Sequence, residues 1–301
     1  MEDSDSAACR AAAFAWFRER APISDYTFTR TELGQGFPYR GSMVKLVGPQ
    51  GIFKPQQIAH YPLTITTTTK GPYSDSFDPS GDFLLYSYRG VDPQFHENRR
   101  LRDAMRDRIP LIYFYGTVNG VYLAVFPVFI VGDNPGALQF TVAADDPAIL
   151  DYDRDDTDDT ARRSYITRTV RFRMHQRSFR DRVLRAYQRQ CAICRLRHSS
   201  LLDAAHITAD ADQMGEPIVS NGLALCKIHH AAFDRMYFGI RPDYRIVVRP
   251  EIMEESDGPM LRHGLQEIHS RYLTVPRRRG DRPDPDRLGA RFEAFAESAE
   301  L

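Results

Sequence analysis

The sequence predicts an α+β protein in which a mostly β N-terminal barrel is joined, through an acidic linker and a basic helix, to a smaller mixed domain. Three observations carry this prediction. Short apolar runs alternate with turn residues in the first half, Asp gathers near the middle, and three of the four cysteines lie between residues 191 and 226. A chain of 301 residues has room for about two domains. We expect them at 1–150 and 164–301, with the linker at 151–163.

The N-terminal half begins with a helix and continues as strands. Residues 7–20 are rich in alanine with phenylalanines on one side, which predicts a short helix. From Pro22 to Val131 the apolar runs are short and turn residues separate them, which predicts a compact β domain with one helix near residues 93–106. Asn119-Gly120 stands between two such runs and predicts a β-hairpin over residues 111–131.

Charge is segregated along the chain, although 40 basic and 40 acidic residues cancel. Residues 145–159 hold eight Asp and one Arg, and 151–160 lack the apolar surface needed to fold, so they predict a linker. Residues 162–197 hold twelve Arg and one acid, mostly within a helix expected at 164–190. Ordinary solvated helices mix signs, so this bias favours a helix along a phosphate backbone over a plain surface helix. The expected phosphate contacts are Arg171, Arg173, Arg177 and Arg180.

No run of about 18 apolar residues occurs, and the acidic first residues lack the basic start of a secretory signal. We therefore expect a cytoplasmic protein without a membrane span. In such a reducing compartment disulfides are disfavoured, and three clustered cysteines cannot all pair.

Cys191-x-x-Cys194 and Cys226-x-x-His229 form two knuckles of equal spacing. Each can present two ligands to one tetrahedral Zn²⁺, so the four residues predict a structural zinc site. The alternative is a zinc ribbon without catalytic function.

Three polar residues between and beside the knuckles, His206, Asn221 and His230, are not explained by a zinc ribbon. With this order and spacing the segment resembles the HNH (ββα-metal) endonuclease family. The resemblance implies that His206 takes a proton from water, that Asn221 holds the loop and the His206 ring, and that His230 binds a catalytic Mg²⁺ or similar divalent ion. Asp234 follows His230 by four residues on a predicted helix, shares its face and is expected as a second ligand.

One departure from the family affects the set of metal ligands. Many members carry Asp or His directly before the first His, where this chain has Ala205. Asp203 is a further candidate ligand, but alternation along a regular strand places it opposite His206. His229 and His230 could exchange roles; the repeated knuckle spacing assigns His229 to zinc.

The N-terminal half is similar to the reader domains of predicted bacterial restriction endonucleases, in which an HNH module follows a PUA/SRA-like barrel. The similarity covers about residues 20–145 and is carried by Gly-Pro-x-Gly-Ile-Phe-Lys-Pro at 48–55 and Tyr-Ser-Asp-Ser-Phe-Asp-Pro at 73–79. It implies that a modified cytosine is flipped into a pocket of aromatic rings and hydrogen-bond acceptors. Alternatively, two of the candidate tyrosines, at 86 and 88, pack the core. The candidates are Tyr73, Asp75, Phe77, Asp78, Tyr86 and Tyr88.

Together the resemblances imply an endonuclease that cleaves double-stranded DNA containing 5-methylcytosine or another modified cytosine. One HNH site cuts one strand, so we expect a homodimer or pairing on the DNA. One alternative is an HNH nuclease without modification dependence. The other is a catalytically degenerate DNA-binding protein, which is suggested by Ala205 at a position where many family members carry a metal ligand.

Overall fold

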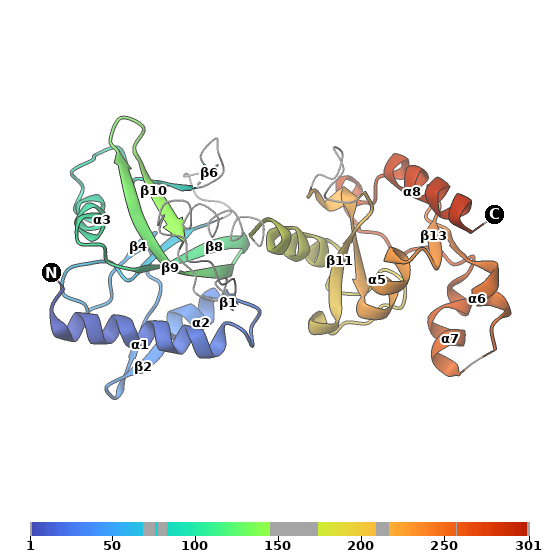
Figure 1. Ribbon diagram of the computed structural model, residues 1–301, viewed down its shortest axis with the longest axis horizontal. Coiled ribbons are helices and arrows are strands. Elements are labelled where there is room, and N and C mark those ends of the chain that lie inside the picture. The colour runs from blue at the N-terminus through green and yellow to red at the C-terminus, as the bar shows by residue number, and fades with distance from the viewer. Residues whose placement is uncertain are drawn as a thin grey trace, which may run out of the picture. The chain divides into compact units, whose positions relative to one another are not determined.

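The computed structural model describes residues 2–68, 76–77, 83–144, 174–208, 217–256 and 258–299. The chain divides into two compact units, Met1–Met174 and His175–Leu301, here called the N-terminal and C-terminal units. Both mix helices with strands, which confirms the α+β class (Figure 1). The expected linker and the domain boundary at residue 150 lie outside the described residues.

A curled sheet forms the centre of the N-terminal unit (Figure 1). Its order is β4-β5-β8-β9-β10-β7-β6 with β1 beside β9, and of the described strands only β5 and β8 pair in parallel. Among the described strands no pairing joins the two ends of this path, so the expected barrel is confirmed only as a curled sheet. The strands are β1 (Thr27–Thr29), β4 (Ile52–Phe53), β5 (Thr64–Thr67), β6 (Ser76–Phe77), β7 (Leu84–Ser87), β8 (Leu111–Val118), β9 (Val121–Asn134) and β10 (Gln139–Ala144).

The hairpin expected at Asn119-Gly120 is confirmed by the pairing of β8 with β9. Gly120 has a φ of +79°, a left-handed backbone that glycine adopts without a Cβ penalty. Beside the main sheet, β2 (Phe37–Tyr39) and β3 (Ser42–Val44) form a separate two-stranded ribbon.

Helices cover two hydrophobic cores in this unit. The first core lies under α1 (Ser4–Arg20), where Phe17 contacts Phe114 and Phe126, and the second lies under α3 (His96–Arg106), which buries Leu101 and Ala104. A third helix, α2 (Arg30–Gln35), begins at a capping box. The expected helices at 7–20 and 93–106 are thus present with small shifts of their first residues.

The C-terminal unit is built around a short hairpin and the helix that follows it. A helix described over 174–186 packs on the hairpin through Phe179 and Val183, and it ends before 190 because Gln188 and Arg189 take left-handed φ angles. The other elements are β11 (Leu202–His206), β12 (Gly222–Cys226), α5 (Lys227–Asp234), β13 (Phe238–Ile240), β14 (Ile246–Val248), α6 (Pro250–Glu254), α7 (Pro259–Gly264) and α8 (Pro285–Ser298).

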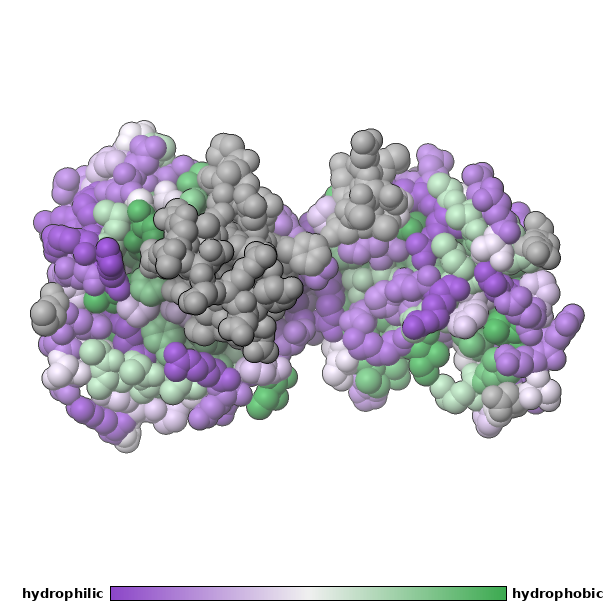
Figure 2. All heavy atoms as spheres, in the orientation of Figure 1, coloured by the Kyte–Doolittle hydropathy of each residue, from purple (hydrophilic) through white to green (hydrophobic). Residues whose placement is uncertain are grey.

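Hydrophobic and hydrophilic side chains intermingle on the face shown in Figure 2. Among the described helices, none combines the length and apolar character that a bilayer crossing requires.

Candidate metal centre

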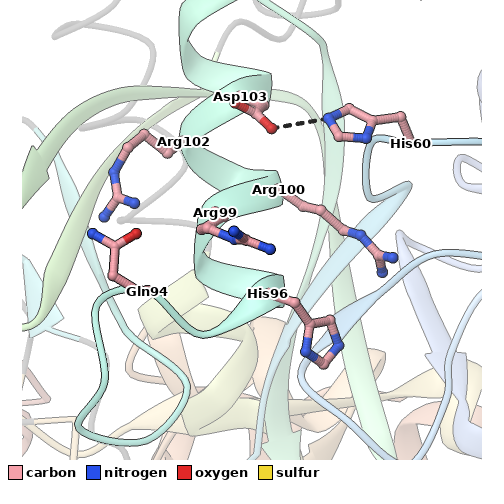
Figure 3. A pocket seen from close by; sticks show the side chains of 7 residues that line it. All are labelled: His60, Gln94, His96, Arg99, Arg100, Arg102 and Asp103. Atoms are coloured by element: carbon pink, nitrogen blue, oxygen red, sulfur yellow. Dashed lines mark hydrogen bonds and ion pairs between the residues drawn. The ribbon is translucent and has the colours of Figure 1, made fainter.

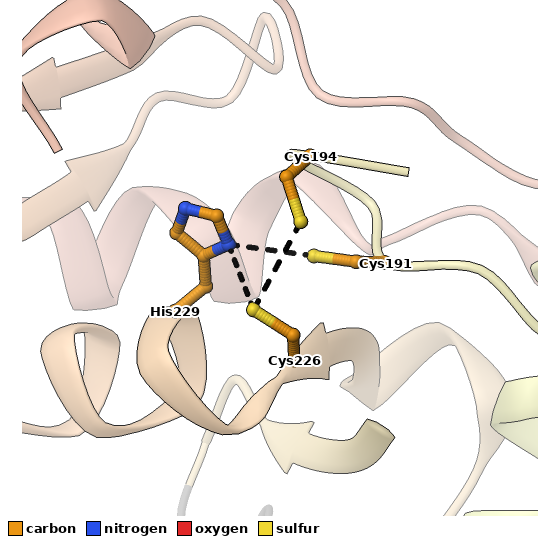
Figure 4. A group of neighbouring side chains, drawn as sticks. All are labelled: Cys191, Cys194, Cys226 and His229. Carbon is orange, nitrogen blue, oxygen red and sulfur yellow. Dashed lines mark hydrogen bonds between the residues drawn. The ribbon is translucent and has the colours of Figure 1, made fainter. Parts of the chain in front are cut away.

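Two knuckles bring three sulfurs and one imidazole together (Figure 4). The first is the turn after the 174–186 helix, which carries Cys191 and Cys194. The second begins α5, with Cys226 at the N-cap and His229 in the first turn. The ligand atoms of the four residues all lie within 4.8 Å of one another.

The geometry of these four residues fits a tetrahedral metal ion. Around a zinc ion, tetrahedral ligands would be about 3.8 Å apart for two sulfurs and about 3.6 Å for sulfur and nitrogen. The observed separations are 3.9 Å between Cys194 Sγ and Cys226 Sγ, and 3.5 and 3.2 Å from His229 Nδ1 to Cys191 Sγ and Cys226 Sγ. The predicted four-residue cluster is therefore assembled with the spacing that such an ion needs.

A second contact fixes the tautomer of His229. Its Nε2 lies 2.8 Å from the carbonyl oxygen of Gly264. A carbonyl only accepts, so Nε2 carries the proton and Nδ1 presents its lone pair to the sulfurs. Hydrogen bonding between two thiols lowers the pKa of Cys191 and raises the pKa of Cys226 to about 11. A cation must displace such protons, so its binding to the cluster depends on pH.

His230, the next residue on α5, lies between two carboxylates. Its Nδ1 is 3.5 Å from Asp203 Oδ2, and its Nε2 is 3.3 Å from Asp234 Oδ2. The hydrogen bond from His230, followed by that from Lys227, holds the pKa of Asp203 well below its usual range despite partial burial. Asp203 therefore offers a charged oxygen beside the ring.

The two carboxylates face different nitrogens of the His230 ring. Adjacent ligands around a cation at about 2.1 Å are about 3.0–3.4 Å apart, and the Asp203–His230 separation of 3.5 Å is slightly longer than the upper end of that range. Asp234 lies on the other side of the ring, 3.3 Å from Nε2, where a carboxylate commonly orients a metal-binding imidazole. Strand alternation alone placed Asp203 opposite His206; the structure brings its carboxylate to 3.5 Å from His230 on α5, and its function as a metal ligand stays a prediction.

His206 ends β11 and is held by an aromatic neighbour. Its ring stacks on Phe179, with the centroids 4.0 Å apart and the planes 10° from parallel. This contact fixes the orientation of the imidazole, and the expected facing of His206 toward His230 stays a prediction.

Asn221 is fully buried in the short 3-10 turn directly before β12. Its Oδ1 accepts from the Thr208 backbone N–H at 2.9 Å, and its Nδ2 donates to the Thr208 carbonyl at 3.1 Å. The side chain thus fastens the loop two residues after His206, as the expected positioning role requires.

Two residues outside the expected set also contact the site. Lys227 Nζ lies 2.5 Å from Asp203 Oδ2. Arg291, from α8, donates at 3.1 Å to the carbonyls of Ile207 and Phe233 and covers the Phe233 ring at 4.0 Å. Arg291 therefore ties the end of β11 to the end of α5. Lys227 is next to Cys226 in the sequence and could have been proposed. Arg291 is separated from Asp234 by 56 residues, and nothing in the sequence indicates its contact.

Of the four arginines expected on a phosphate backbone, two are described. Arg180 donates to the carbonyls of Ser199 and Leu202 and lies 3.5 Å from Asp203, while Arg177 lies 3.8 Å from Asp181. Both guanidinium groups are engaged within the C-terminal unit. Arg171 and Arg173 lie outside the described residues.

Two of the six expected base-binding residues have side chains that the structure describes. Tyr73, Asp75 and Asp78, and the side chain of Phe77, lie outside the described residues. Tyr86 and Tyr88 are buried in the core under α3, and the Tyr88 hydroxyl donates to Asp133. Their burial favours the core-packing interpretation of these two tyrosines.

Residues 191–241 match the HNH_2 family, described as HNH endonuclease. No curated protein matches the chain. Among solved structures it is similar to the modification-dependent TagI restriction endonuclease, at 16% identity over 82% of this chain and 85% of that one, with a TM-score of 0.28. It is also similar to the Type IV phosphorothioation-dependent restriction endonuclease ScoMcrA, at 16% identity over 68% of this chain and 54% of that one, with a TM-score of 0.27.

TM-scores this low carry no argument about this chain. The family match does, because it spans both knuckles, the β11-β12 hairpin from its first residue to its last, and all of α5. Residues 191–241 are therefore an HNH endonuclease domain, and the chain is a nuclease.

Proposed function

We propose that this chain is a metal-dependent DNA endonuclease that hydrolyses phosphodiester bonds through its C-terminal unit. The observation that carries the proposal is the juxtaposition of Asp203 and His230 at 3.5 Å, inside the segment that matches HNH endonucleases. A charged oxygen and an imidazole nitrogen at that distance suit a hard divalent cation.

Two metals are proposed with different functions. Zn²⁺ in the cluster of Cys191, Cys194, Cys226 and His229 would be structural, because all four ligand positions come from the protein. Mg²⁺ or a similar cation, held by Asp203 and His230, would stabilise negative charge on the phosphate and the leaving 3′-oxygen. Asp234 orients His230 by accepting its Nε2 proton.

We assign His206 as the general base. A neutral imidazole can take a proton from the attacking water at physiological pH. Stacking on Phe179 restricts its ring, and Asn221 holds the loop that follows it. A variant His206→Ala is expected to stop cleavage while DNA affinity persists.

We propose that the N-terminal unit chooses the target and that the target contains modified cytosine, with 5-methylcytosine as the first candidate. This rests on the likeness of residues 20–145 to reader domains and on the presence of a second compact unit beside the nuclease. A single HNH site cuts one strand, so double-strand cleavage would use a homodimer or two copies paired on DNA.

The test is cleavage of matched plasmids, one cytosine-methylated and one unmodified, with Mg²⁺, Mn²⁺, Co²⁺ or Ni²⁺. We expect faster cleavage of the methylated plasmid. If two copies act together, the ratio of linear to nicked plasmid should rise with enzyme concentration. Equal cleavage of both plasmids would remove the modification dependence but leave the nuclease. Absence of cleavage with every ion would favour a degenerate DNA-binding protein.

A further inference from the structure

A cavity of about 570 Å³ opens beside α3 in the N-terminal unit, outside the nuclease site (Figure 3). Three arginines of the helix, Arg99, Arg100 and Arg102, line it together with His96, and Gln94 lies on the loop before the helix. Every lining side chain is polar or charged, and no Phe, Tyr, Trp or aliphatic side chain among the described residues contributes to the wall.

The wall of this cavity is rigid because buried contacts fix both the loop and the helix. Asn98 is fully buried, accepts from the Arg89 N–H at 2.9 Å and donates to the carbonyls of Arg89 and Asp92. Arg102 is held by Asp133, with Nε 2.5 Å from Oδ2, and by the Tyr88 hydroxyl at 3.1 Å. The site is therefore shaped in the absence of a ligand.

The charges of Arg99 and Arg100 are not neutralised by any described acid of the cavity. Asp103, the acid in the wall, is engaged by His60 at 2.9 Å and by Arg106 at 3.0 Å. Within the part of the chain that the structure describes, Arg99 and Arg100 make no ion pair. Burial, with the charge of Arg100 as the second cause, lowers the pKa of Lys54 nearby. Strongly hydrophilic side chains gather over the region of α3 in Figure 2.

The chemistry of the wall favours a phosphate over a base. Among the described wall residues no Phe, Tyr or Trp ring is present to sandwich a base, whereas three guanidinium groups match phosphate oxygens. The first turn of α3 has no side-chain cap, so its N–H groups add positive potential at the same place.

We propose that this α3 cavity binds backbone phosphates of duplex DNA and gives the N-terminal unit a sequence-independent contact with its target. The inference rests on the proposed DNA substrate. Arg99 and Arg100 contact phosphate oxygens, and Arg102 supports them from its place on Asp133.

The experiment measures binding of the full chain to a fluorescent duplex of about 30 base pairs by anisotropy across a salt series, without added Mg²⁺. For Arg99→Gln/Arg100→Gln we expect about tenfold weaker binding at 0.1 M salt and a log K against log salt slope reduced by about 2. The matched control is Arg18→Gln/Arg20→Gln on α1, which removes two exposed charges outside the cavity and should change neither quantity. Melting curves check that both variants are folded.

An unchanged slope in the α3 variant would overturn the inference, as would an equal loss in both variants. Titration with ATP and with inorganic pyrophosphate tests whether the cavity binds a free phosphate compound instead. Tight binding of either compound, together with an unchanged salt slope for DNA binding in the α3 variant, would also overturn the inference. Plasmid cleavage is measured separately with Mg²⁺. A chain that binds DNA through α3 but cleaves none would contradict the proposed function alone.

Discussion

At the scale of single residues, the ring of His230 is the centre of the proposed nuclease site. One nitrogen faces Asp203 and the other faces Asp234. Because a cation would bind only one of these nitrogens, we propose that the two carboxylates differ in function. Asp203 is the less exposed of the two, with 23% of its side chain accessible against 54% for Asp234, and it is the one whose pKa is lowered by its neighbours.

We expect Asp203→Asn and Asp234→Asn to have unequal effects. Loss of the charged oxygen of Asp203 should prevent cleavage at every Mg²⁺ concentration in the titration. Asp234→Asn should raise the Mg²⁺ concentration needed for half-maximal cleavage about 10–100-fold. The measurement is a Mg²⁺ and Mn²⁺ titration of plasmid cleavage, with Asp243→Asn, an exposed acid on the loop after β13, as control. A larger loss in Asp234→Asn would reverse the assignment.

Tyr187 predicts an alkaline limit for the C-terminal unit. Burial raises the pKa of its phenol far above the ordinary 10.0, and the hydroxyl donates to the Gly222 carbonyl at 3.3 Å. The folded state keeps the proton while the unfolded chain releases it near pH 10. The stability contributed by the neutral phenol is therefore complete below pH 10 and falls as the pH rises above it.

The measurement is urea unfolding of the protein between pH 8 and 11, compared with Tyr187→Phe. The variant should lose the part of the alkaline destabilisation that ionisation of Tyr187 causes. Parallel pH profiles for the two proteins would show that Tyr187 ionises in the folded state.

At the scale of elements, the β11-β12 hairpin is placed by close packing against the 174–186 helix. Gly222 pairs with His206, and a Cβ on Gly222 would lie 2.4 Å from Val183 Cγ2 and 2.8 Å from Phe179 Cζ. Phe179 is the ring on which His206 stacks. The arginine-rich helix that the sequence analysis placed along a DNA backbone thus supports the hairpin through its apolar side.

Gly222→Ala should therefore disturb both stability and catalysis. We expect about 1–3 kcal/mol lower free energy of unfolding from overpacking, and slower cleavage because Phe179 must move away from the His206 ring. Thermal melting and plasmid cleavage measure the two effects. Gly280→Ala, where an added Cβ meets nothing within 4 Å, is the matched control and should behave as the parent chain.

At the scale of the whole molecule, the two units have separate cores and should respond separately to loss of metal. The Cys191, Cys194, Cys226 and His229 cluster joins the first knuckle to α5, so removing its ion should unfold the C-terminal unit. The N-terminal unit has no part in that cluster and contains the single tryptophan, Trp16, on α1.

Chelator treatment under reducing conditions should therefore lower the helical circular dichroism and abolish cleavage while Trp16 fluorescence stays native. Added Zn²⁺ should restore the dichroism. Loss of both signals in one transition would show that the two units unfold together.

The sequence by itself determined the parts of the site whose spacing is local. Ligands within a knuckle, or at i and i+4 on a helix, are held together by the backbone geometry of one element, so Cys191 with Cys194 and His230 with Asp234 could be paired in advance. The hairpin at Asn119-Gly120 was predictable for the same reason, since the turn needs a left-handed glycine.

Only the tertiary structure decided which distant groups meet. Asp203 reaches His230 because strand pairing and helix packing bring β11 against α5, and Arg291 reaches the same place from α8, 57 residues beyond Asp234. The α3 cavity depends likewise on Asn98 and Asp133, which fix a loop and an arginine. Such contacts join elements whose relative position follows from burial of apolar surface across the whole unit, which no local pattern of residues specifies.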